Sequence, residues 1–303
     1  MSEVVTQAGV PAAFEEFRSL WRRSIEQGRL EEAEEIIQRA LAWAREHADQ
    51  VCVDSAVCSL AAVAIYLGRG DADLPHLREI LLRSGDTANC RMAAYYISVK
   101  YQYLRNYKKS RFYARIACDR AQEEGRRDWI AFTAHQLGNG LLGESFVEEA
   151  AQSYETAVKL VPEPGVWRAV ALDNLGYCRV LQGRFAEGYS CLYESLRLSR
   201  RFSAERYQVR PHIDLCFAHL ETGKYLQARR HGIAAIELAE KFGDAELIKN
   251  ALYLLGETAN LMGETDSAGS YFSRLQRDYY PDASYLPSFL LTVDVRKMVN
   301  LHA

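Results

Sequence analysis

The sequence is poor in proline and lacks the cysteine patterns of disulfide-bonded or zinc-binding modules. Only seven prolines occur in 303 residues, and they cluster at turns, which favours helix. The seven cysteines show no C-x-x-C spacing, and an odd number cannot form a complete set of disulfides. They lie in apolar helical patterns, where a thiol behaves as a small hydrophobic side chain. The composition therefore predicts a helical protein with free, buried thiols.

The chain also lacks a membrane-spanning run and an overall charge bias. No stretch reaches the roughly 18 apolar residues that a transmembrane helix needs. Residues 1–13 have no basic region followed by an apolar run, so we expect no signal peptide and a cytoplasmic protein. The net charge is −3, and the arginine-rich stretch 197–230 is interrupted by glutamates, as on a solvated helix face. Nucleic acid and membranes are therefore not expected partners.

What the sequence does contain is a regular series of glycines. Glycines at 28 and 68, and again at 183, 223 and 263, are spaced 40 residues apart. The interval of 115 residues between positions 68 and 183 is close to three more such periods. Self-similarity at a fixed period is the mark of a solenoid, in which each unit packs only on its neighbours.

One stretch shows the chemistry expected of a repeat unit. Small and aromatic residues follow the pair Leu137-Gly138 at fixed distances: Ala150, Tyr154, Ala157 and Pro162. Small residues allow two antiparallel helices to approach closely, an aromatic ring fills the space between them, and a proline ends the second helix.

This pattern resembles the tetratricopeptide repeat. Related small residues recur at 33, 110, 150, 188, 228 and 268, with room for one more unit at about 54–85. The resulting seven units begin near Phe14, Asp54, Arg91, Ala131, Ala169, Val209 and Lys249. They are longer than the roughly 34 residues usual in the family and are similar to those of bacterial sensor and regulatory proteins. The resemblance implies an all-α, right-handed superhelical solenoid of antiparallel helix pairs.

The resemblance also suggests how the chain is divided. We expect a disordered segment at 1–13, the solenoid at 14–280 and a C-terminal capping segment with a helix at 281–303. Polar connectors ending in Asp86, Asp128 and Asp244 are placed to cap the helices that follow. From Ser288 onward, Leu291, Val295, Met298 and Val299 fit one face of a helix that covers the open end of the solenoid. Surplus apolar residues on this helix leave open a second role, as an edge that forms a homodimer or holds a partner.

In the tetratricopeptide family the first helix of each unit lines the concave face. By register, this face would form an aromatic groove with amide and charged groups, suited to an extended or helical peptide. The residues assigned to it are Tyr95, Val99, Tyr103, Phe132, His135, Asn139, Asp173, Asn174, Tyr177, Arg210, Phe217, Tyr253, Glu257 and Asn260.

Four of these residues resemble a clamp that some tetratricopeptide domains use for a C-terminal carboxylate. They are His135, Asn139, Asn174 and Arg210. Asp214 stands where the clamp has a second basic residue and would repel a carboxylate, which argues against a receptor for chaperone tails. The two asparagines would then contact a peptide backbone, or they would only tie adjacent helices together, since buried amides find partners in either case.

Catalytic and metal-binding motifs are not evident. Phosphate-binding glycine loops, H-E-x-x-H and G-x-S-x-G do not occur. His135 and Asp173 could act as a base and its orienting group, but no nucleophile shares their face. His212, Cys216 and His219 form one helical stripe of metal-capable side chains, at the register where the family packs its helices together. We therefore expect no enzyme, no cofactor and no metal.

Two functions remain in the sequence interpretation. The first is a non-catalytic adaptor that binds a protein or peptide in the groove. The alternative is a regulatory sensor, in which a peptide or small ligand changes the superhelix and so acts on an output protein supplied in trans.

Overall fold

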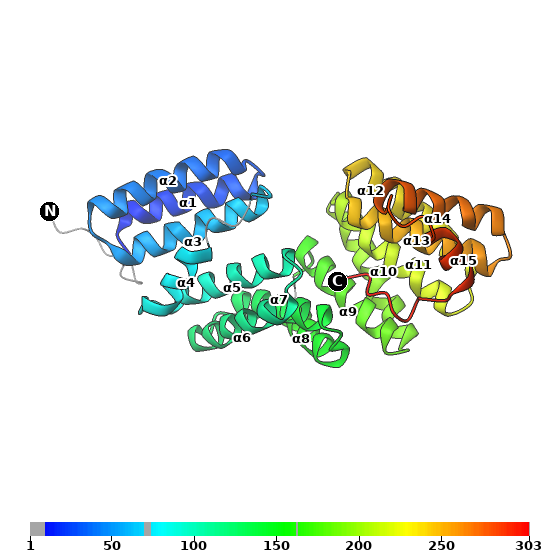
Figure 1. The fold of residues 1–303 in the computed structure, drawn as a ribbon. Helices are drawn as coiled ribbons and strands as arrows, with labels where there is room; N and C mark the ends of the chain where they lie inside the picture. The colour runs from blue at the N-terminus through cyan, green and yellow to red at the C-terminus, as the bar shows by residue number, and fades with distance from the viewer. Residues whose placement is uncertain (1–9, 70–73, 162, 303) are drawn as a thin grey trace. The chain divides into compact units, whose positions relative to one another are not determined.

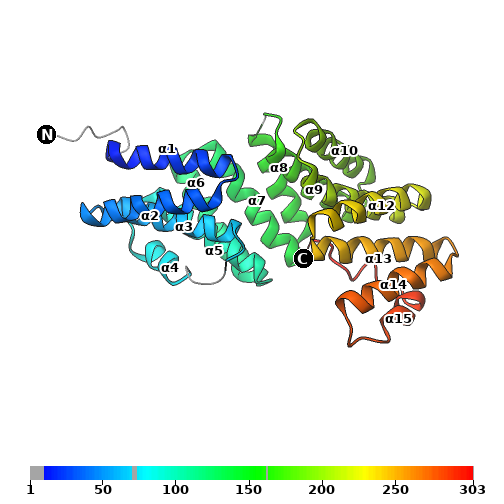
Figure 2. The same cartoon turned by 90° about the horizontal axis from the view of Figure 1, so that it is seen from above.

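The structure is a computed structural model that describes residues 10–69, 74–161 and 163–302. The secondary-structure elements of these residues are all helices. The chain divides into two compact units, the first as far as Gly140 and the second from Leu141 onward. The division falls inside helix α7. Figures 1 and 2 show the helices in chain order, coloured from the N-terminus to the C-terminus.

The helices alternate with short turns throughout the described residues. The first unit holds α1 (Ala12–Glu26), α2 (Leu30–Glu46), α3 (Gln50–Tyr66), α4 (Leu74–Arg83), α5 (Thr87–Tyr103), α6 (Tyr107–Glu124) and most of α7 (Arg127–Gly143). The second holds α8 (Val147–Leu160), α9 (Val166–Leu181), α10 (Phe185–Arg201), the 3-10 turn η1 (Glu205–Gln208), α11 (Val209–Glu221), α12 (Tyr225–Phe242), α13 (Ala245–Leu261), α14 (Thr265–Tyr279) and α15 (Leu286–Thr292).

The predicted repeat order is confirmed. Each of the seven predicted unit starts falls in the first turns of an odd-numbered helix from α1 to α13. The small-residue positions 33, 110, 150, 188, 228 and 268 are all buried. The expected disordered segment 1–13 lies mostly outside the described residues, but its end is ordered: Val10 is buried against Phe14, and α1 begins at Ala12.

The glycine series marks one recurring turn. The five glycines all have positive φ, between 68° and 79°. In each case the next residue's N–H donates to the carbonyl five residues back, as Arg184 does to Arg179 at 2.8 Å, which is a Schellman motif at the helix end. Arg105 and Ser145 occupy the same turn position in the two units without a glycine, with φ of 53° and 65°. The glycine series is therefore interrupted only because other residues replace glycine in these two units, and the conformation of the turn is the same.

Aspartate capping is confirmed at two of the three predicted sites. The side chain of Asp86 accepts a hydrogen bond from Asn89 N at 2.7 Å, and that of Asp244 accepts one from Leu247 N at 3.3 Å. Asp128 lies inside the first turn of α7 and pairs with the Arg126 side chain instead. The seven cysteines are free thiols, and all but Cys191 are buried, as expected.

The C-terminal helix is shorter than predicted. Its apolar pattern suggested a helix from Ser288 to beyond Val299, but α15 ends at Thr292 and the chain continues in turns. Val295 and Leu301 are buried and Met298 is exposed, so these residues do not share one helical face. The expectation failed because an irregular chain can also bury apolar side chains, which requires no helical period.

The left-handed turns provide a direct test of the repeat assignment. Gly183→Ala should lower the free energy of unfolding by about 1 kcal/mol, because an alanine Cβ disfavours positive φ. No atom lies within 4 Å of that added Cβ, so steric contact does not contribute. Ser145→Gly should raise the same quantity by up to about 1 kcal/mol. Urea denaturation followed by circular dichroism measures both changes.

Gly85→Ala is the matched control, because Gly85 also has open space around its Cβ position but no positive φ. A loss of stability in this control as large as in Gly183→Ala would show that the conformation of the turn is not the cause.

Candidate functional site

Residues 293–302, here called the C-terminal segment, turn back from α15 and lie against α9, α11 and α13. These are first helices of their units, and we call the surface that they present to the segment the first-helix face of the second unit. Figure 1 shows the end of the chain, in red, running back to α9.

The main chain of Leu301 is held from two helices. Leu301 N donates to the Tyr177 hydroxyl of α9 at 3.0 Å, and its carbonyl accepts from Asn250 Nδ2 of α13 at 2.9 Å. The leucine is only 4% exposed. One residue of irregular chain is thus bound through both its backbone polar groups and its side chain.

Two further amides hold the chain around this point. Asn260 Nδ2 of α13 donates to the Leu291 carbonyl at 3.3 Å. In the reverse direction, Asn300 Nδ2 of the segment donates to the Leu142 carbonyl at 2.8 Å. The contacts of Tyr177 and Asn250 use backbone atoms of Leu301 and so depend little on the sequence of the bound chain, whereas the Asn300 contact depends on a side chain of the segment.

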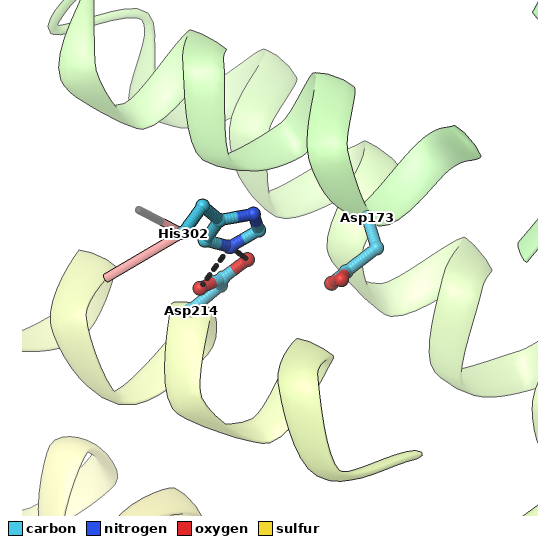
Figure 3. A group of neighbouring side chains, drawn as sticks. All are labelled: Asp173, Asp214 and His302. Carbon is cyan, nitrogen blue, oxygen red and sulfur yellow. Dashed lines mark hydrogen bonds and ion pairs between the residues drawn. The ribbon is translucent and has the colours of Figure 1, made fainter. Parts of the chain in front are cut away.

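His302 is bound by stacking and hydrogen bonding. Its ring lies parallel to that of Tyr177, with centroids 4.1 Å apart and planes at 6°. Its Nε2 lies 2.8 Å and 3.0 Å from the two carboxylate oxygens of Asp214 on α11 (Figure 3). Burial lowers the pKa of His302 to about 3, so the imidazole is neutral near pH 7.

Asp173 of α9 completes a compact cluster with Asp214 and His302. One potential ligand atom from each residue lies within 4.8 Å of the others. Asp173 is 2% exposed, and its Oδ1 has no hydrogen-bond partner within the described part of the chain. Burial raises the pKa of both carboxyl groups well above the ordinary value, and each aspartate lies in the field of Arg210, which acts in the opposite direction. These are the side chains of the site that could hold a cation.

Charged groups anchor the beginning of the segment. Arg296 contacts Glu221 of α11 at 3.0 Å, Asp294 of the segment at 2.6 Å and Glu257 of α13 at 3.8 Å. Glu257 is 3% exposed, and burial raises its pKa to about 7 in spite of Arg296. Tyr253, one turn earlier on α13, is buried with a hydroxyl that has no hydrogen-bond partner among the described residues.

The structure therefore brings together several of the residues assigned by register. Asp173, Tyr177 and Glu257 lie at the C-terminal segment, and Phe217 packs with its ring centroid 6.0 Å from that of Tyr177. Asn260 contacts Leu291 of α15, just before the segment. Asn174 is also buried on α9, whereas the Arg210 side chain is exposed.

The assigned residues of the first unit lie on α5 and α7. Trp129 makes edge contacts with Tyr95 and Phe132, at centroid distances of 5.8 Å each. Burial lowers the pKa of His135 to about 4, and Tyr103 is 70% exposed.

The residues of the predicted clamp are divided between the two units. Asn139 belongs to the first, where its Nδ2 donates to Gln102 at 3.3 Å and to Gln136 at 3.2 Å, tying α7 to α5. His135 lies in the same unit, whereas Asn174 and Arg210 lie in the second. A peptide contact through Asn139 and Asn174 remains a prediction.

The histidine stripe packs in the interior, as its register predicted. His212 Nδ1 lies 2.9 Å from His231 Nδ1 of α12, and His219 contacts the hydroxyls of Tyr189 and Tyr193 at 3.2 Å and 3.1 Å. Burial lowers the pKa of His212 to about 4, which keeps it neutral.

A pocket of about 310 Å³ lies in the first unit. Its lining includes Trp21, Arg91, Arg126 and Trp129. Arg91 is 1% exposed; Nε and Nη2 pair with Glu124 at 2.7 Å and 3.1 Å, and its guanidinium lies 3.8 Å from the Trp129 ring centroid. Its remaining Nη1 has no partner in the described residues.

The sequence analysis did not predict that the C-terminal segment lies on the first-helix face of the second unit, and it missed two residues that bind this segment. Asn250 and Asp214 were not assigned to the site; Asp214 was treated only as a mismatch to a clamp. A signal for Asp214 was present, because it lies 40 residues after Asn174, at the same place in the next unit. The C-terminal segment carried no such signal, since its contacts are not periodic.

Solved structures of repeat proteins resemble this chain. The apo form of RapI is 14% identical, with 94% of this chain and 84% of that chain covered and a TM-score of 0.66. A tetratricopeptide repeat protein from Parabacteroides merdae is 15% identical, with coverage of 94% and 99% and a TM-score of 0.54. A Rap protein complexed with Competence and Sporulation Factor is 14% identical, with coverage of 96% and 100% and a TM-score of 0.55.

At these identities the similarity establishes the fold, which is that of a tetratricopeptide repeat protein. No protein-family model and no curated protein matches the sequence. Among the helices of the described residues, none combines the length and apolar character needed to span a bilayer.

The buried Glu257 predicts an inverse dependence of stability on pH. Its folded pKa of about 7 exceeds the usual 4.5, so the folded chain holds more protons than the unfolded chain between these values. This contribution to stability is complete below pH 4.5 and is lost as pH rises through 7. Glu257→Gln should therefore raise the free energy of unfolding by about 1–3 kcal/mol at pH 8. The difference from wild type should shrink toward pH 4.5 in denaturant titrations.

Glu221→Gln is the control, since it removes the carboxylate 3.0 Å from the same Arg296. It should not stabilise the chain at pH 8. Equal stabilisation by both variants would mean that the charge surplus around Arg296, and not burial of Glu257, is responsible.

Proposed function

We propose that this chain is a non-catalytic scaffold whose first-helix face in the second unit binds a non-helical peptide segment of a partner protein. The observation that carries the proposal is the C-terminal segment itself, which occupies this face as a peptide ligand would. In this function the segment and the partner compete for the same residues.

The chemistry of the face fits peptide recognition. Tyr177 and Asn250 satisfy the N–H and carbonyl of one bound residue, which supplies affinity that does not depend on side chains. The burial of Leu301 and the stacking of His302 supply selectivity, because an apolar side chain and a planar ring are accommodated at successive positions. The preferred ligand is therefore a non-helical segment with an apolar residue followed by an aromatic or imidazole ring.

The fold supports this reading by analogy only. A Rap protein of the same fold has been solved in complex with Competence and Sporulation Factor. We further place the protein in the cytoplasm, where its free thiols stay reduced. A homodimer through α15 would have to use Phe289 and Val293, which are exposed, since Leu290 and Leu301 are buried within the chain.

Removal of the C-terminal segment should open the face. A chain that ends at Thr292 should bind a labelled synthetic peptide of residues 293–303, whereas the full chain should bind it weakly because its own segment competes. Tyr177→Phe in the shortened chain removes the hydroxyl that accepts from Leu301 N, at a cost of about 1 kcal/mol, or roughly 5-fold in Kd. Fluorescence anisotropy measures all three.

A peptide with Leu301 and His302 both replaced by alanine serves as the matched control and should bind much more weakly. A shortened chain with wild-type helicity that binds neither peptide would refute the peptide-binding face. A partner captured from lysate by the shortened chain should be displaced by the wild-type peptide, and retention of that partner would place its site elsewhere.

We propose as a second candidate that the first unit senses an anionic ligand, because its pocket contains the incompletely paired Arg91. Glu124 accepts hydrogen bonds from Nε and Nη2, the Trp129 ring faces the guanidinium, and Nη1 has no hydrogen-bond partner among the described residues. A carboxylate or phosphate attached to a flat ring would match this arrangement of guanidinium and indole groups.

Benzoate and adenosine monophosphate are suitable probes, with inorganic phosphate as the ring-free comparison. The ring-bearing probes should raise the melting temperature and quench tryptophan fluorescence. Arg91→Lys keeps the charge opposite Glu124 but removes the planar fork, so it should weaken the response at least about 10-fold. Arg120→Lys, on the surface beside Glu123, should not. Equal responses in both variants would exclude the pocket.

A further inference from the structure

The first-helix face contains two buried carboxyl groups whose presence the peptide-binding function does not explain. Two carboxyl groups, Asp173 and Asp214, are buried at 2% and 0% exposure on neighbouring helices α9 and α11. Buried carboxylates are normally paired with cations or coordinate metals, because loss of hydration disfavours the charge. The nearest basic ring, His302, hydrogen-bonds Asp214 and leaves Asp173 Oδ1 without a partner among the residues described.

The three side chains converge on one point. Figure 3 shows Asp173 extending from α9 toward the pair formed by Asp214 and His302. Their potential ligand atoms all lie within 4.8 Å of one another, and the shortest separation is 2.8 Å. Two atoms that each lie about 2.1 Å from a shared zinc ion are separated by at most about 4.2 Å. Movements of less than about 1 Å would therefore bring all three into a first coordination sphere.

We propose that Asp173, Asp214 and His302 bind a divalent transition-metal ion, represented by Zn²⁺, which fastens the C-terminal segment to the first-helix face. One imidazole nitrogen and two carboxylate oxygens form a donor set that zinc accepts, with a fourth position left for water. Calcium and magnesium prefer more oxygen ligands and no nitrogen, so they fit the site less well. The ion would occupy the place toward which the unpartnered Asp173 oxygen points.

The site links two parts of the chain that are far apart in sequence. Its aspartates belong to the helical scaffold, whereas its histidine belongs to the C-terminal segment. The Tyr177 ring stacked on His302 holds the imidazole in orientation, as groups behind metal ligands commonly do. A bound ion would thus stabilise the occupied form of the face specifically, since release of the segment removes one of the three ligands.

Direct metal binding tests the proposal. The full chain, stripped with EDTA and dialysed, should bind one Zn²⁺ in calorimetry and give a visible d–d absorption band with Co²⁺. Asp173→Asn and His302→Ala should each raise the Kd for Zn²⁺ at least about 10-fold, the lower end of the effect of losing even an outer-shell partner. His302→Ala keeps the test valid if the Asp173 variant fails to fold, because it changes only the end of the segment.

His231→Gln is the matched control, since it removes an imidazole from the other histidine cluster, beside His212. It should leave the Kd unchanged. Loss of binding in His231→Gln with retention in His302→Ala would move the metal to that cluster and overturn the proposal. The absence of Zn²⁺ binding by the stripped wild-type chain would also overturn it, and would mean that a proton neutralises the buried pair.

Fastening of the segment has its own readout. Lys297 is exposed within the C-terminal segment and is a site for trypsin. Zn²⁺ should slow cleavage after Lys297 in the wild-type chain and have no effect on it in His302→Ala. Equal cleavage rates in the wild type with and without the ion, under conditions where calorimetry shows binding, would contradict the fastening role. These readouts use no partner peptide, so they are independent of the proposed peptide-binding function.

Discussion

The left-handed residue that ends each first helix is the constraint on which the site depends. Because the chain reverses there with the same hydrogen bonds in unit after unit, successive first helices restart in the same rotational register. Residues 40 positions apart then lie at equivalent places on neighbouring helices. Tyr177, Phe217 and Glu257 are spaced in this way, and all three belong to the face that holds the C-terminal segment. The site is thus produced by the repeat period.

The same local origin explains why the fold was predictable. Positive φ favours glycine, close helix packing favours alanine and serine, and both preferences are visible in sequence without knowledge of distant contacts. The two units with Arg105 and Ser145 at the turn broke the glycine series but kept the small-residue register, so the unit count survived. The length of the C-terminal helix was overestimated for the opposite reason. Val295 and Leu301 are buried although the chain there is not helical, and nothing in the local sequence distinguishes them from a helical stripe.

Only the part of the site that follows the period could be placed from the sequence. Register alone puts Asp173, Tyr177, Glu257 and Asn260 on first helices, as observed, and their role in binding a partner is still a prediction. What they bind was not predictable, since Leu301 contacts residues 124 and 51 positions earlier in the chain. The role of Asp214 also depends on which chemical group lies opposite it. Opposite a carboxylate it would be repulsive, whereas opposite the imidazole of His302 it is a hydrogen-bond acceptor.

In the proposed function, occupation of the face by the chain's own segment changes how a partner must bind. A ligand binds only those molecules in which the segment has left the face. Its apparent affinity is therefore its intrinsic affinity multiplied by the fraction of such molecules. Each contact that holds the segment stabilises the form in which the segment covers the face. The free energy of partner binding is reduced by the same amount. Contacts made to the main chain of Leu301 can be replaced by those of any peptide backbone, but the hydrogen bond of His302 with Asp214 can be replaced only by a ligand with similar chemistry. Selectivity of the face should accordingly reside where the Leu301 side chain is buried and where His302 meets Asp214, and affinity at Tyr177 and Asn250.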